Sequence, residues 1–427
     1  MIKPIPFGKY LLLDKIATGG MAEIFIARST GLSGFEKFVA IKRILPHHAS
    51  NEAFLSMFLD EARITVGLHH SNIVQIYDFG DIEGHYFLAM EYVEGKNLRE
   101  ILARVEENNE KLPLEHAIYI ASEVAKGLDY AHRKKDEKNH IPLKIVHRDV
   151  SPQNVLASYE GELKLIDFGI AQAGIENENH KGILKGKFSY MSPEQATGSH
   201  VDSRSDIFSC GILLYELLTA QKLFTAQSDS SVLSLIQSAA IPSPSLLNPL
   251  IPKSLESILY KALKKDVNQR YQRALDFHKD LTQLLYQLHP SYTSADLAAY
   301  LQKTFVADVV AHKKKMKEII HFLEEFSQKE MVPSEQKSSK GTCDLYTKKM
   351  QHEATYIGQK PSGDKINNKS QYAVRSQRPF QALAMTWLRV GILSFLILAL
   401  LLFWHQLFKK YKAPRLPAKV EEKKISD

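Results

Sequence analysis

Short apolar runs, separated by glycine and polar residues, occupy the first part of the chain and are typical of β-strands. One helical pattern interrupts them over 52–68, where apolar side chains recur at spacings near four. This order predicts a small lobe built mainly of strands over about residues 7–93. The predicted strands include residues 11–13, 24–27, 38–41, 73–76 and 86–90.

Helical spacing dominates the next part of the chain, from about residue 94 to 288. Pro113 opens the clearest helix, because proline is favoured in a first helical turn, and two further helices are predicted over 212–218 and 275–288. Strands followed by helices predict an α+β fold in two lobes. An amphipathic stretch over 291–326 predicts a helical extension, in which we interpret the lysines at 313–315 as a solvated face.

The end of the chain has a different composition. Residues 327–382 are rich in Lys, Ser, Gln and Asn and lack apolar periodicity, so we expect a flexible basic linker. Residues 383–404 contain Arg389 as their only charged residue. These 22 residues suffice to cross a hydrocarbon core of about 30 Å, which predicts one transmembrane helix. A short basic tail, 405–427, follows it.

The net charge of +7 is unevenly distributed. Residues 1–326 hold 37 basic and 40 acidic residues, a net of −3, whereas residues 327–427 hold 18 and 8, a net of +10. The excess positive charge therefore lies in the tail, and we expect no nucleic-acid partner for the folded part. Two cysteines, Cys210 and Cys343, are too few for a disulfide framework.

Two segments concentrate residue types that are common in active sites. Residues 145–156 and 163–169 each begin with an apolar, strand-like run and then present a carboxylate. The motifs that matter are His147-Arg148-Asp149 with Asn154, Asp167-Phe168-Gly169, Val39-Ala40-Ile41-Lys42, Glu61, Ser192-Pro193-Glu194, Asp206 and Arg270. This ordered set resembles the protein kinase family over about residues 7–285, and it is most similar to bacterial eukaryotic-like (Hanks-type) serine/threonine kinases.

The resemblance implies a bilobal kinase fold and a role for each charged residue in moving the γ-phosphoryl group of ATP. Asp149 would accept the proton of the acceptor hydroxyl and orient it. Lys42, paired with Glu61, would contact the α- and β-phosphates. Asn154 and Asp167 would hold Mg²⁺, or Mn²⁺ in its place, because both offer hard oxygen ligands.

The resemblance also implies a nucleotide pocket between the lobes. Met90 would be the gatekeeper, and the backbone of Glu91 and Val93 would hydrogen-bond the adenine. The other predicted ATP contacts are apolar walls from Ile16, Ile24, Ala40 and Leu156, a phosphate loop of Ala17, Thr18, Gly19, Gly20, Met21 and Ala22, and a ribose contact from Asn97. Asp206 would brace the catalytic loop, and Glu194 and Arg270 would form a buried ion pair.

The chain departs from the family pattern at several positions. In the phosphate loop, alanines replace the outer glycines, which reduces the flexibility of the loop but leaves the central Gly19. In the catalytic loop, Ser151 stands where serine/threonine kinases usually carry lysine, and Lys187 stands where they carry threonine. We expect a reciprocal exchange, in which Lys187 supplies the charge that faces the phosphate and Ser151 the hydroxyl. A crippled or altered enzyme is the alternative.

Few hydroxyl groups are available to regulate the activation segment. Between Asp167 and Ser192 the chain offers only Ser189 and Tyr190, so we expect weak dependence on phosphorylation there. The serines and threonines of the 327–382 linker are the expected sites of autophosphorylation, although they equally suit a soluble linker.

The sequence thus predicts a membrane-anchored protein serine/threonine kinase with protein substrates, acting in signal transduction, its kinase domain cytoplasmic and its single span in the cell membrane. The basic residues after 383–404 favour the opposite orientation, which leaves open a hairpin or an interfacial segment. The alternative function is a nucleotide-binding pseudokinase or signalling scaffold. A third reading, transfer to tyrosine or to a small molecule, fits the catalytic loop less well.

Overall fold

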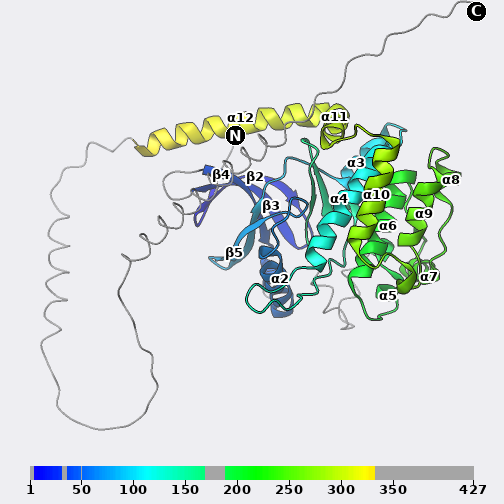
Figure 1. Ribbon diagram of the computed structural model, residues 1–427. Helices are drawn as coiled ribbons and strands as arrows, with labels where there is room; N and C mark the ends of the chain where they lie inside the picture. Colours follow the sequence, from blue (N-terminus) through cyan, green and yellow to red (C-terminus); the bar gives the residue numbers. More distant parts are fainter. Residues whose placement is uncertain (1–3, 31–35, 50, 169–187, 332–427) are drawn as a thin grey trace, which may run out of the picture. The chain divides into compact units, whose positions relative to one another are not determined.

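The small lobe is an antiparallel sheet with one long helix against it. The computed structural model describes residues 4–30, 36–49, 51–168 and 188–331, and Figure 1 shows their arrangement. The strand order in the sheet is β1-β2-β3-β4-β6-β5. The elements are β1 Ile5–Phe7, β2 Tyr10–Thr18, β3 Ala22–Thr30, β4 Glu36–Ile44, β5 Ile76–Ile82, β6 His85–Glu91, the short helix α1 Pro46–Ala49 and the long helix α2 Glu52–Val66.

Alternation along the strands explains the two apolar layers of this lobe. Leu12, Ile41 and Phe87 belong to the cluster on one face of the sheet. Ala40 and Met90 belong to the other cluster, which includes Phe58 and Ala62 of α2. The predicted helix and four of the five predicted strands are confirmed.

The fifth predicted strand, 73–76, is wrong for most of its length, because β5 begins only at Ile76. Ile73 instead forms an isolated parallel bridge with Leu165, and the Val74 N–H donates to the Leu165 carbonyl at 2.9 Å. This apolar run therefore joins the small lobe to the rest of the domain.

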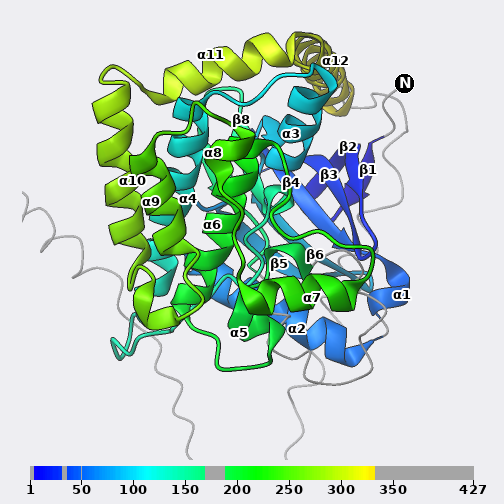
Figure 2. The ribbon, with the colours of Figure 1, turned by 90° about the vertical axis from the view of Figure 1, so that its right-hand side faces the viewer.

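The second lobe is helical, and Figure 2 shows how its helices surround α6. Nearly every side chain of α6 is buried, from Ser205 to Thr219. Gly211 lets α9 approach closely, since a Cβ atom there would lie 2.9 Å from Leu263. The helices are α3 Leu98–Glu107, α4 Leu114–His132, α5 Pro193–Ala196, α6 Ser203–Thr219, α7 Asp229–Ser238, α8 Pro244–Leu247, α9 Lys253–Ala262 and α10 Ala274–Leu288.

A second sheet, of three strands, lies in the helical lobe next to the small lobe. Its strands are β7 Gly95–Asn97, β8 Val155–Ser158 and β9 Leu163–Leu165, in that order. The predicted helices at Pro113, 212–218 and 275–288 correspond to α4, α6 and α10. Pro113 occupies the N-cap position directly before α4, so it begins that helix as the sequence indicates.

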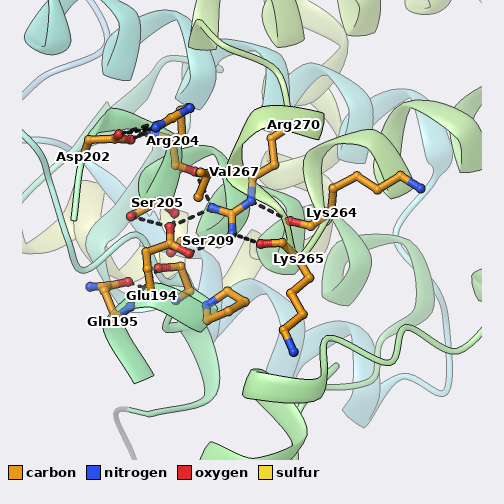
Figure 3. Close-up of polar contacts among 12 residues, drawn as sticks. Glu194, Gln195, Asp202, Arg204, Ser205, Ser209, Lys264, Lys265, Val267 and Arg270 are labelled. Atoms are coloured by element: carbon orange, nitrogen blue, oxygen red, sulfur yellow. Dashed lines mark hydrogen bonds and ion pairs between the residues drawn. The ribbon is translucent and has the colours of Figure 1, made fainter. Parts of the chain in front are cut away.

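A buried ion pair ties Glu194, at the end of the predicted activation segment, to the helical lobe (Figure 3). Arg270, 2% exposed, donates to both carboxylate oxygens of Glu194 at 2.7 and 2.8 Å. Its remaining N–H groups donate to the carbonyls of Lys264, Lys265 and Arg204. Burial alone would raise the pKa of Glu194, but the hydrogen bonds from Arg270 and Ser205 hold it below its ordinary value. The predicted structural ion pair is confirmed.

The helical extension forms two helices, α11 Ser294–Thr304 and α12 Val306–Met331. The second ends at Met331, beyond the predicted limit of residue 326, and so takes in the first part of the predicted linker. The rest of the linker, the apolar segment 383–404 and the tail lie outside the described residues. Within 4–30, 36–49, 51–168 and 188–331, no helix combines the length and apolarity needed to cross a membrane.

Candidate active site

A lysine from the small lobe meets a carboxylate from the helical lobe. Lys42 lies on β4, opposite Leu88 of β6, and Asp167 follows β9. The Lys42 Nζ atom is 2.7 Å from Asp167 Oδ1. Asp167 adopts a left-handed backbone, with φ of 53°, which is uncommon for a residue other than glycine and concentrates at functional sites. The two predicted phosphate- and metal-binding groups are thus adjacent.

One buried carboxylate, that of Asp206, holds the backbone of loop 147–154; we call this contact the clamp. Asp206, fully buried in the first turn of α6, accepts from the backbone N–H groups of His147 and Arg148, both at 2.8 Å. His132 Nε2 of α4 lies 2.7 Å from the same carboxylate. Burial alone would raise the pKa of Asp206, but these hydrogen bonds hold it below its ordinary value. Arg148 has φ of 65°, so the clamp fixes an unfavourable backbone directly before Asp149.

The two predicted catalytic segments are also joined to each other. Asn154 Nδ2 donates to the Asp149 carbonyl at 2.9 Å, and the Ile166 N–H donates to the Asn154 carbonyl at 3.0 Å. The His147 ring packs 4.5 Å from the buried ring of Phe168, and burial lowers the pKa of His147, which favours its neutral form. Asp149, Asn154 and Asp167 therefore belong to one connected backbone unit.

The donor set fits a magnesium ion. Asp167 offers carboxylate oxygens, and Asn154 keeps its amide oxygen available because its amide nitrogen makes the bond to Asp149. Mg²⁺ is commonly held by one or two protein oxygens together with phosphates and water. It does not need a larger cluster, and the described part of the chain holds no group of three or more His, Cys, Asp or Glu side chains arranged for a metal.

Most predicted walls of the adenine pocket belong to one apolar cluster that spans the two lobes. Ala40 and Met90 are buried in it, and Ile24, Val93 and Leu156 pack against it. A cavity of about 20 Å³ lies behind Met90 and reaches Asp167 and Phe168. Ile16, on β2, is 46% exposed and stands outside the cluster.

Asn97, the predicted ribose contact, caps α3. Its side chain accepts from the Glu100 N–H, and the Glu100 carboxylate accepts from the Asn97 N–H, both at 3.0 Å. This reciprocal box gives Asn97 a structural role at the start of α3, and the ribose contact stays a prediction. Glu91 makes a backbone hydrogen bond to Gln75 at 2.8 Å through its N–H, so its predicted adenine contact would use its carbonyl.

The phosphate loop is a tight turn between β2 and β3. The Gly19 N–H donates to the Ala22 carbonyl at 2.8 Å, and Ala17 pairs with Ile24 across the hairpin. A Cβ atom at Gly20 would meet nothing within 4 Å, so space is not what restricts this loop. His48, at the end of α1, lies 2.9 Å from the Gly20 carbonyl. This contact was not predicted, because nothing in the adjacent histidines 47–48 indicates it.

A small polar cavity of about 70 Å³ is lined in part by Asp149. Ser151, 7% exposed, lines it together with Arg99 of α3 and Lys222. Sequence reasoning missed Arg99 and Lys222, since only the fold brings them beside the catalytic loop. Tyr190 also lines the cavity.

The Tyr190 side chain is hydrogen-bonded to the helical lobe. Its hydroxyl donates to the Glu216 carboxylate and accepts from Arg99 Nη2 at 2.5 Å, and Arg99 also pairs with Glu216 at 2.8 Å. Burial and the neighbouring Glu216 raise the pKa of Tyr190 well above its ordinary value. One of the two hydroxyls of the activation segment therefore serves to anchor it.

Some predicted site residues cannot be placed. Gly169 and Lys187 lie outside the described residues, as does the side chain of Glu61, although α2 carries its backbone. The Lys42–Glu61 ion pair and the Ser151/Lys187 exchange accordingly stay predictions.

Comparison with known proteins agrees with this geometry. A family model described as protein kinase domain matches residues 10–283. The crystal structure of the Mycobacterium tuberculosis PknI kinase domain, in a single-site mutant form, is similar with a TM-score of 0.50 and 24% identity. The match covers 65% of this chain and 96% of that one. At this identity the likeness concerns the fold alone.

Curated relatives match the same region. Tyrosine-protein kinase MasK of Myxococcus xanthus is 41% identical over 301 residues, which are 70% of this chain and 46% of MasK. Serine/threonine-protein kinase PrkC of Bacillus subtilis is 36% identical over 275 residues, 64% of this chain and 40% of PrkC. The chain thus spans less than half the length of these relatives.

Removing the carboxylate of Asp206 tests the clamp. Asp206→Ala leaves the N–H groups of His147, Arg148 and His132 without their buried acceptor, so we expect a loss of about 3 kcal/mol or more in the free energy of unfolding. We also expect phosphotransfer to fall by about tenfold or more, because Asp149 loses its support. Asp229→Ala, on the exposed start of α7, is the control and should change stability by less than about 1 kcal/mol. Urea unfolding measures the free energy of unfolding, and a phosphotransfer assay measures kcat. An unchanged kcat in a destabilised Asp206→Ala would contradict the positioning role.

Proposed function

The chain belongs to the protein kinase family, and from this premise we propose that it is an active, membrane-anchored kinase that phosphorylates serine and threonine in proteins, itself included. The observation that carries the proposal is the contact of Lys42 Nζ with Asp167 Oδ1 at 2.7 Å. It lies next to a loop in which Asn154 is hydrogen-bonded to Asp149. A pseudokinase usually lacks one of these groups. Here the phosphate-binding, metal-binding and proton-accepting side chains are all present.

Each group has a distinct part in the proposed reaction. ATP would supply the γ-phosphoryl group, and a bound Mg²⁺ would neutralise much of its charge. Lys42 attracts the phosphates, and Asn154 and Asp167 would hold the metal through oxygen atoms. Asp149 orients the acceptor hydroxyl and takes its proton. The apolar cluster around Met90 receives the adenine and excludes water from it.

The relatives differ in the acceptor that their names state: PrkC is called a serine/threonine kinase and MasK a tyrosine kinase. Serine and threonine are supported by the catalytic loop, His147 to Asn154, which lacks the Ala-Arg pattern of tyrosine kinases. Tyrosine transfer is the second candidate because MasK has the higher identity of the two.

We place the proposed anchor at 383–404, with the kinase domain in the cytoplasm. The support is the length and apolarity of this segment together with the cytosolic supply of ATP. Sedimentation of the chain with membranes, compared with a chain lacking 383–404, tests the anchor, and equal sedimentation of both would contradict it.

Labelled-phosphate transfer from ATP, followed by phosphoamino-acid analysis, tests the function. With Mg²⁺, we expect the full chain to form phosphoserine or phosphothreonine, and Asp149→Asn to lower transfer by about a hundredfold or more. Phosphotyrosine alone would overturn the acceptor assignment and favour the second candidate. Absence of any transfer despite ADP binding would favour the pseudokinase.

The proposed Ser151/Lys187 exchange has its own test. Lys187→Ala should lower kcat by about tenfold or more, because it would remove a charge that faces the transferred phosphate. Lys185→Ala, two residues earlier in the same segment, is the matched control and should have a small effect. A near-normal kcat for Lys187→Ala in the same transfer assay would contradict the exchange.

A further inference from the structure

The last helix of the structure contacts both lobes and the segment between them. Figure 1 shows α12, in yellow, running from α11 beside the helical lobe past the sheet of the small lobe. Side chains three or four positions apart share one face of a helix. Those that contact the domain follow this spacing: Asp308, His312, Lys315, Ile319 and Leu323.

The first turn of α12 is fixed to the helical lobe. Phe305, directly before it, is 2% exposed and belongs to the main core. Asp308 lies 3.0 Å from Lys96 and 3.5 Å from Arg104 of α3. The hydrogen bond from Lys96 holds the pKa of Asp308 below its ordinary value, so this end of the helix keeps its charged contact at neutral pH.

The middle of α12 lies against residues 92–94, which join the two lobes. His312 Nε2 is 3.1 Å from the Glu94 carboxylate, and the His312 ring is 6.1 Å from the ring of Tyr92. Tyr92 itself packs against the apolar cluster of the adenine pocket. The helix therefore contacts Tyr92 and Glu94, which are sequence neighbours of the predicted adenine contacts Glu91 and Val93.

The second half of α12 packs on β2. Ile319 is fully buried and Leu323 is 5% exposed, in a cluster with Leu11 and Leu13 of β2. Lys315 Nζ lies 2.5 Å from Asp14 Oδ2 on the same strand. From Asp308 to Leu323 the helix advances about 22 Å, so a single rigid element reaches from the helical lobe to this strand.

We propose that α12 is a positioning element of the catalytic domain, which holds β2 and the nucleotide loop against the helical lobe and thereby sets the affinity for ATP. The strand that it contacts continues from Asp14 to Ile16, a predicted apolar wall of the adenine pocket, and to Ala17, the start of the predicted phosphate loop. Asp149 and Asn154 lie on the helical lobe. Loosening α12 thus weakens nucleotide binding while leaving the catalytic loop in place.

The test compares two adjacent isoleucines in the full chain, purified in detergent. Ile319→Asp places a charge in the buried contact with β2, whereas Ile320→Asp places it at a position that is 44% exposed. We expect Ile319→Asp to raise KM for ATP and Kd for ADP with Mg²⁺ by about tenfold, with kcat and KM for the protein substrate within about twofold. Ile320→Asp should match the unmodified chain in all four quantities.

A charge exchange provides a milder second variant. Lys315→Asp should weaken ADP binding, and adding Asp14→Lys should restore it, because both side chains are partly exposed and the swap rebuilds the pair. The proposal rests on the nucleotide site proposed above but not on the acceptor, and ADP binding reports on it even if phosphotransfer fails. ADP affinity of Ile319→Asp within twofold of Ile320→Asp, or a higher kcat/KM for ATP, would overturn it.

Discussion

The contact between Lys42 and Asp167 is the constraint on which the rest of this structure depends. These groups come from different lobes and are 125 residues apart in the chain, yet both must face the same phosphates for the proposed reaction to occur. Neither lobe can build the site alone. Three other features bear on function because they position this contact. The sheet of the small lobe presents Lys42, and the three-stranded sheet leads to Asp167. Helix α12 connects the two lobes.

The helical lobe supports its half of the site with buried charged side chains that form a full set of hydrogen bonds. Asp206 accepts three hydrogen bonds at full burial, and Arg270 donates to Glu194 and to three carbonyls. A buried charge with complete partners adds little net stability compared with apolar residues, but losing one partner is strongly destabilising. These groups therefore contribute more to fixing a conformation than to the free energy of unfolding. They hold the catalytic loop and the end of the activation segment in one arrangement.

The sequence predicted the order of elements and the charged site residues because motif spacing and apolar periodicity are local signals. Asp206 and the Glu194–Arg270 pair also came from motifs. The run 73–76 misled, since an apolar stretch looks the same whether it pairs in a sheet or bridges two lobes. Arg99, Lys222 and the grip of α12 on Leu11 and Leu13 carry no local signal. They arise from packing between segments far apart in the chain, and only the folded structure brings them together.

The most direct test of the account is a crystal structure of the full chain with Mg²⁺ and a non-hydrolysable ATP analogue. The account predicts adenine among Ala40, Met90 and Leu156, phosphates at Lys42, and metal density on Asp167 and Asn154. The Lys42–Asp167 contact would then be bridged by ligand atoms. Nucleotide bound elsewhere, or bound here with no metal on Asp167 and Asn154, would contradict the assignment of these residues to phosphoryl transfer.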